Sequence, residues 1–139
     1  MDEAEFYRRL PEVRAAAGDR AVLRAMHIFD DNRRVTEQTE ALRSGRFDSF
    51  LRLVNESGES SWKYLQNVIP SGSREHQSMA FTIALCKKLL NGRGAVRVHG
   101  GGFAGTALAF VPDGEFNKFR EGVERVLGAG CCHKLSIAK

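Results

Sequence analysis

The sequence is poor in cysteine and contains no long apolar run. Three cysteines occur among its 139 residues, and an odd number without a paired framework indicates free thiols in a reducing compartment. No apolar run approaches the roughly 18 residues that a membrane-spanning helix needs. The acidic segment 1–5 is followed by no apolar stretch, so no secretory signal is expected. These absences predict a cytoplasmic protein without a membrane partner.

The chain also lacks a cluster of basic residues. Its formal net charge of +4 is spread along the sequence and mixed with acidic residues; the densest pair, Arg33 and Arg34, stands beside Asp30 and Asp31. A nucleic-acid-binding face would combine clustered Lys and Arg with aromatic residues, so no nucleic-acid partner is predicted. The balance of 42% hydrophobic and 27% charged residues is typical of one globular domain over 1–139.

Motifs for catalysis and for metal binding are missing as well. No G-x-x-x-x-G-K-[ST] segment occurs, which excludes a P-loop, and the spacing indicates no Ser/His/Asp or Cys/His arrangement. Zinc sites separate neighbouring Cys ligands by about two to four residues and add a second pair, whereas residues 131–133 read Cys-Cys-His. We therefore predict no catalytic residue and no metal ligand in this chain.

Helical patterns fill the first two-thirds of the sequence, where apolar residues recur at helical spacing. The predicted helices cover 2–10, 19–42, 47–58 and 79–90. Pro11 begins a further turn after the first of these helices. Gly58 is expected to weaken the third, and the composition of 66–73 predicts a loop.

The last third changes to strand patterns. Strands are predicted over 95–99, 106–111 and 133–137, with a helix capped by Asp113 between the second and the third. The order is helices, then strand, loop, strand, helix and strand. It predicts an α+β fold with a small antiparallel sheet packed with several helices.

Glycines gather between the first two predicted strands. The segment reads Gly100, Gly101, Gly102, Phe103, Ala104 and Gly105. Glycine costs backbone entropy, so such a cluster implies special dihedral angles or a close approach of backbone. Two interpretations stay open: a tight bend that packs the strands, or a loop that presents amides to an anion or another loop. If Gly100 to Gly102 adopt dihedral angles that are closed to other residues, Gly101→Val is expected to destabilise the fold by about 1–3 kcal/mol.

The other motifs of the chain can be interpreted without assigning them a function. The glycines formally match G-x-G-x-x-G, but a dinucleotide site needs a helix after the loop, and here a strand pattern follows. His99 either points toward what the loop faces or lies in solvent. His27, close to an apolar stripe, is predicted to be a core or partly buried histidine. The serine-rich segment 57–61 lacks a glycine-rich lead-in and is interpreted as structural.

Three segments carry a resemblance to a known family. Residues 24–35 contain Arg-x-x-His followed by Asn-x-Arg-Val-like residues, and 41–47 read Ala-Leu-x-x-Gly-x-Phe with Arg46 where the family has an acidic residue. Residues 94–105 carry the glycine motif. Together and in this order they resemble the C-terminal half of galactokinase-type kinases of the GHMP superfamily, over about 5–137.

The resemblance implies the GHMP kinase C-terminal domain, an α+β sandwich with a ferredoxin-like core. It also implies an ATP-dependent sugar 1-kinase that phosphorylates galactose with ATP and Mg. In the family the third motif supports the phosphate loop at the active-site cleft, which would place 100–105, and with them His99, at that cleft. The family's N-terminal kinase half carries the sugar signature, the phosphate loop and the catalytic Asp, and it is absent from this sequence.

We therefore expect a C-terminal kinase portion that is inactive alone and binds neither ATP nor Mg by itself, so its standing as an enzyme stays open. The expected partner is an N-terminal kinase half, or a second copy through Phe103 and the sheet edge 106–110. A stand-alone binding or regulatory module and one subunit of a split kinase are the alternatives. Gene fragment, split subunit and module, like sugar specificity and oligomeric state, stay open.

Overall fold

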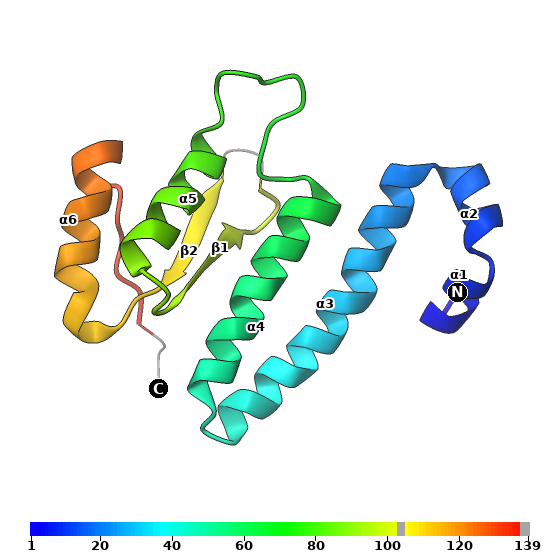
Figure 1. Ribbon diagram of the computed structural model, residues 1–139, viewed down its shortest axis with the longest axis horizontal. Helices are drawn as coiled ribbons and strands as arrows, with labels where there is room; N and C mark the ends of the chain where they lie inside the picture. Colours follow the sequence, from blue (N-terminus) through cyan, green and yellow to red (C-terminus); the bar gives the residue numbers. More distant parts are fainter. Residues whose placement is uncertain (103–104, 137–139) are drawn as a thin grey trace.

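The structure is a computed structural model that describes residues 1–102 and 105–136. Figure 1 shows its helices and strands. They are α1 (Glu3–Arg8), α2 (Leu10–Ala17), α3 (Asp19–Arg43), α4 (Phe47–Ser60), the π-helix η1 (Ser61–Leu65), α5 (Ser78–Leu90), β1 (Ala95–His99), β2 (Thr106–Phe110), the 3-10 turn η2 (Asp113–Glu115) and α6 (Phe116–Leu127). The predicted α+β class, with a small antiparallel sheet packed with helices, is confirmed. Over the described ranges, no helix has the length and apolar character needed to cross a membrane.

The first three helices fold back on one another at one side of the molecule (Figure 1). α1 begins at Asp2, whose carboxylate accepts a 2.7 Å hydrogen bond from the Glu5 N–H. Gly18 separates α2 from α3 with φ of +81°, a conformation that side chains disfavour. The Phe6 ring then lies against Phe29 of α3, with centroids 5.3 Å apart. The break at Gly18 thus returns α1 to the side of α3.

Helix α4 continues past the point where the sequence predicted it to weaken. It runs through Gly58 to Ser60 and continues as η1, which ends at Gln66 with φ of +55°. The prediction was wrong because Gly58 serves packing between elements. A Cβ at Gly58 would come within 2.8 Å of the Arg97 Cβ in β1, so the glycine lets α4 approach the sheet backbone closely.

The two strands form an antiparallel hairpin in which Ala95 pairs with Phe110. Alternate side chains point to opposite faces of the sheet, so Val96 and Val98 lie on one face and Arg97 lies on the other, against α4. The buried cluster around the two valines is completed by Val68, Met79, Ala80, Ile83, Cys86, Leu90, Phe119 and Val123. The sheet therefore lies between α4 on one face and α5 with α6 on the other.

The predicted third strand is wrong for the residues that the structure describes. Residues 131–136 form no strand, and residue 137 lies outside the described ranges. Cys132 packs against the core cluster, while Leu135 is 77% exposed. Lys134 lies over the Phe116 ring, 5.1 Å from its centroid. Side-chain contacts hold this segment in place, whereas the prediction assumed backbone hydrogen bonds to a neighbouring strand.

The last helix also begins later than predicted. Asp113 does not cap it; instead η2 precedes α6, and the Glu115 N–H donates to the Pro112 carbonyl at 2.9 Å. That bond closes a 3-10 turn, which moves the start of α6 to Phe116.

Asn55 of α4 covers part of the free edge of β1. Its Oδ1 accepts a hydrogen bond from the Val96 N–H at 3.1 Å, and its Nδ2 donates to the Gly94 carbonyl at 3.2 Å. A neighbouring strand would engage the same two groups. A strand edge with open N–H and C=O groups invites association with another chain. Here the side chain of Asn55 satisfies two such groups.

Replacing Asn55 with alanine should lower the free energy of unfolding by about 1–3 kcal/mol, since the Val96 N–H and the Gly94 carbonyl lose their partner in a half-buried place. Urea denaturation followed by circular dichroism measures the change. Asn117→Ala, at an exposed position of α6, is the matched control and should change stability by less than about 0.5 kcal/mol. Equal midpoints for both variants would show that the edge needs no cap.

Candidate functional site

The glycine loop joins the two strands at one end of the sheet. Gly100 and Gly102 have φ of +67° and +79°, and the Gly105 N–H donates to the Gly102 carbonyl at 3.2 Å. The left-handed angles explain two of the glycines, because side chains rarely adopt them. Phe103 and Ala104, which the sequence placed at the site, lie outside the described residues.

Asn67, from the loop after η1, anchors this hairpin loop. Its side chain is buried, with 4% of the residue exposed. Its Nδ2 donates to the Gly101 carbonyl at 3.5 Å, and its Oδ1 accepts from the Ser61 hydroxyl at 3.1 Å. A Cβ on Gly102 would overlap the Asn67 backbone carbonyl. Gly102 thus allows two loops, 35 positions apart in sequence, to touch through their backbones.

Gly101 differs from its neighbours. It has no positive φ, and a Cβ built there would meet no atom within 4 Å. The condition for a destabilising Gly101→Val substitution is therefore met at Gly100 and Gly102 but not at Gly101 itself. The exposed side of Gly101 is open for another molecule or chain to approach.

His99 ends β1 opposite Thr106 and is exposed. By alternation it shares the sheet face of Arg97, which is the face toward α4. His99 directly precedes the glycine loop in the sequence. Its role at a cleft stays a prediction.

Serines on α4 and η1 build a polar seam between α3, α4 and the sheet. Ser60 Oγ lies 2.9 Å from His27 Nδ1, and Ser57 Oγ accepts a hydrogen bond from Arg97. Ser61 reaches Asn67 from the same stretch. The structural interpretation of 57–61 is confirmed. Sequence reasoning missed Asn67, whose only signal was its place in a loop-like composition, and it gave no role to Arg97.

His27 is a buried histidine, as predicted, with 4% of its surface exposed. Burial lowers its pKa below the usual 6.5; nearby Asp31 opposes that shift, and Arg34 and Arg97 add to it. Asp31 Oδ2 lies 3.7 Å from His27 Nε2 and also pairs with Arg34 at 3.3 Å. The carboxylate therefore serves two partners, and the imidazole stays neutral near pH 7.

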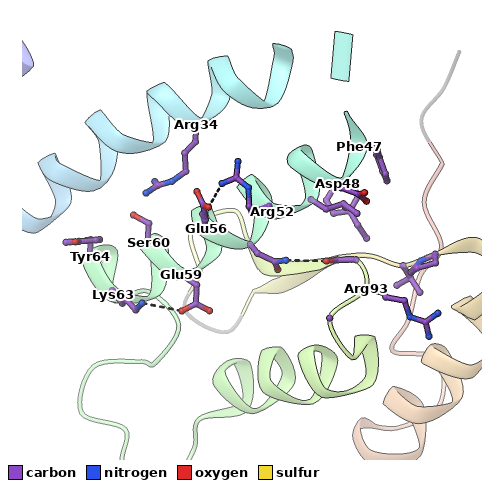
Figure 2. A pocket seen from close by; sticks show the side chains of 17 residues that line it. Arg34, Phe47, Asp48, Arg52, Glu56, Glu59, Ser60, Lys63, Tyr64 and Arg93 are labelled. Carbon is purple, nitrogen blue, oxygen red and sulfur yellow. Dashed lines mark hydrogen bonds and ion pairs between the residues drawn. The ribbon is translucent and has the colours of Figure 1, made fainter. Parts of the chain in front are cut away.

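A hollow lined by residues of α4 lies apart from the described glycines of the loop. An open groove of about 1170 Å³ runs along α4 (Figure 2), with Phe47 toward one end and Arg34 and Tyr64 toward the other. Phe110 and Pro112 also line it. Its four basic side chains each pair with a carboxylate. The pairs are Arg34–Asp31, Arg52–Glu56, Lys63–Glu59 and Arg93–Glu115. Phosphate recognition relies on available cationic donors, so this groove is a poor candidate for a nucleotide site.

Two of the three cysteines have raised pKa values. Burial raises the pKa of Cys86 to about 11, and burial together with Cys131 raises that of Cys132 to about 11. All three cysteines are free, and only Cys131 is exposed. Among the described residues, no three His, Cys, Asp or Glu side chains come together in a way that could hold a metal ion.

The chain thus combines an α+β fold with a glycine hairpin held from behind by Asn67. No family model matches it. It is similar to bacterial galactokinases: 29% identical over 116 residues to that of Actinobacillus pleuropneumoniae serotype 5b (strain L20), and 26% over 117 residues to that of Glaesserella parasuis serovar 5. The galactokinase of Haemophilus influenzae strain Rd is 25% identical over 117 residues.

Each match covers 84% of this chain and 28% of the relative, so the chain spans little more than a quarter of the length of these relatives. A continuous match of 116 residues leaves 23 of the 139 outside it. It must therefore include both His27 and the glycine hairpin, which lie more than 23 residues from either end.

Gly102→Ala should destabilise the fold by about 1–3 kcal/mol, because the new Cβ meets the Asn67 carbonyl at a left-handed φ. Gly101→Ala serves as the control one residue away and should stay within about 0.5 kcal/mol of the wild type. Chemical denaturation of the two variants side by side measures the difference. If both substitutions cost the same, contact with Asn67 does not determine the loop's conformation.

Stability should fall as pH drops below about 6.5, because the folded pKa of His27 is lower than its unfolded value. The unfolded chain takes up the proton first, so the contribution is complete above pH 6.5 and is lost toward the lower folded pKa. Denaturation midpoints measured from neutral pH to about 5, above the range of ordinary carboxylates, report the slope. His27→Gln should flatten it, whereas His76→Gln, at an exposed position, should leave it unchanged.

Proposed function

We propose that this chain is the C-terminal portion of an ATP-dependent sugar 1-kinase of the galactokinase type. Its role is to supply the glycine hairpin to an active site that transfers a phosphoryl group from ATP to galactose. The similarity to galactokinases over 84% of the chain, in a match that includes the hairpin, carries the proposal.

The geometry of the hairpin supports this role. Phosphoryl transfer depends on positioning and on preorganised groups around the phosphates. The hairpin is anchored from behind by Asn67, and the left-handed angles of Gly100 and Gly102 set its shape. Its exposed side at Gly101 carries no side chain, so the backbone of another loop can approach it closely. Such a surface suits support of a phosphate-binding loop that another part of the kinase contributes.

The remaining chemistry belongs to that other part. Magnesium in kinase sites is held by carboxylates and by substrate phosphates, and the part of the chain that the structure describes offers no cluster of such ligands. ATP, magnesium and the sugar would therefore bind mainly outside these residues. In this proposal the residues of the hairpin position the phosphate-binding loop and exclude water from it. They do not exchange protons with the sugar.

The isolated chain should show no phosphorylation of galactose in an assay with ATP and magnesium, because its described residues offer no cluster of ligands that could hold the metal. A chimera should be active: the galactokinase of Actinobacillus pleuropneumoniae with its matching 28% replaced by this chain. Turnover by the chain alone, above a control without protein, would contradict the proposal.

Gly101→Val in the chimera separates function from folding. The substitution meets no neighbour within the chain, so stability should hold while kcat/KM for ATP falls about tenfold or more, as for a misplaced phosphate support. Gly114→Val is the matched control, since Gly114 has equally open surroundings outside the hairpin loop. A folded chimera that binds neither substrate would favour a stand-alone binding module.

A further inference from the structure

The chain leaves helix α4 through an unusual turn. In η1 the Gln66 N–H donates to the Ser61 carbonyl at 3.1 Å, a bond that spans five residues and makes this turn a π-helix. Gln66 then adopts φ of +55°, in the left-handed region that side chains disfavour. Single π turns at the end of α-helices occur frequently at functional sites. Here the turn places the next residue, Asn67, in the interior, with only 4% of its surface exposed.

The side-chain amide of Asn67 is held in one orientation by its two partners. The Gly101 carbonyl can only accept a hydrogen bond, so the Asn67 Nδ2, which lies 3.5 Å away, must be the atom that faces it. Oδ1 then faces the Ser61 hydroxyl, which donates at 3.1 Å. Ser61 is also the residue whose carbonyl closes the π turn. The turn that positions Asn67 therefore also orients its amide.

Asn67 also fills the space behind the next residue of the hairpin. A Cβ built on Gly102 would lie 2.9 Å from the Asn67 Cβ and would overlap the Asn67 backbone carbonyl. Gly102 is thus packed directly against Asn67, while the hydrogen bond from Nδ2 restrains Gly101. One buried residue contacts two consecutive glycines of the hairpin.

The exposed glycines of the hairpin have few other restraints. A Cβ at Gly100 or Gly101 would meet no atom within 4 Å. Within residues 1–102 and 105–136, Asn67 provides the one side-chain hydrogen bond to glycines 100–102. Glycine loses more conformational freedom on ordering than any other residue, so a single anchor has a large effect on the order of such a loop.

We propose that Asn67 is a positioning residue for phosphoryl transfer. Because it is buried behind the hairpin, it acts through Gly101 and Gly102, which it holds in the conformation that supports the phosphate-binding loop. A misplacement of about 1 Å can cost about 10²-fold in rate. The catalytic part of this inference rests on the proposed function, whereas the ordering of the hairpin is a property of this chain alone.

Nuclear magnetic relaxation of ¹⁵N in the 139-residue chain tests the ordering without any kinase activity. Asn67→Asp keeps the acceptor for Ser61 and loses the donor to Gly101. Asn67→Leu has a similar branched shape, loses both hydrogen bonds and buries no carboxylate. In each variant the backbone order parameters of glycines 100–102 should fall from about 0.85, the value of rigid backbone, to below about 0.6.

Asn55→Ala is the matched control for both measurements. It also removes an asparagine that bonds two backbone groups, but these lie at the other end of β1 from the hairpin. The order parameters of glycines 100–102 should therefore stay at their wild-type values. Glycines that are already below about 0.6 in the wild type, or that are equally ordered in Asn67→Leu, would overturn the proposal.

Steady-state kinetics of the chimera tests the catalytic part. Asn67→Leu should raise KM for ATP and lower kcat/KM for ATP about tenfold or more, with KM for galactose unchanged. A loss of folded protein would lower kcat and leave both KM values as they are, and Asn55→Ala should do no more than that. Unchanged ATP kinetics in the Asn67→Leu chimera would overturn the positioning role and leave the proposed function intact. A chimera that is inactive with the wild-type chain would overturn the proposed function, and the catalytic role of Asn67 with it.

Discussion

The close approach of α4 to β1 is the contact on which the rest of the structure depends. Gly58 makes it possible, because any Cβ there would collide with Arg97. At this distance Asn55 reaches both the Val96 N–H and the Gly94 carbonyl. A two-stranded sheet is marginal by itself, so the bonds from α4 on one face and the buried valines under α5 on the other together make it a stable layer.

The same approach connects the seam of serines to the glycine hairpin. Once α4 and η1 lie on the sheet, Ser61 faces Asn67, and Asn67 in turn holds the loop through the Gly101 carbonyl. Contacts within this chain thus constrain the described glycines 100–102 of the loop.

Local patterns in the sequence predicted much of the fold, and contacts between distant residues account for the misses. Apolar spacing located α3 and α5, and the glycine-rich run located the turn between β1 and β2. The prediction at Gly58 was wrong because a glycine within a helix indicates a weak helix when its packing partner is unknown. That partner, Arg97, lies 39 positions away. The role of Asn67 could not be predicted for the same reason, because its partner Gly101 lies far along the chain. The segment after α6 has a strand-like composition, but pairing with β2 depends on geometry that no local pattern contains.

Helix α3 buries a polar network beside the apolar residues Val22 and Ala41. Its inner side stays because His27, Asp31 and Arg34 satisfy one another and Ser60 satisfies the imidazole, which avoids the cost of a buried unpaired group. Such a network fixes one orientation of the helix, since rotation would break several bonds at once. The fixed orientation keeps Ile28, Val35 and Leu42 exposed. Apolar contacts alone would resist rotation of the helix less, so the polar seam decides which residues of α3 stay on the outside.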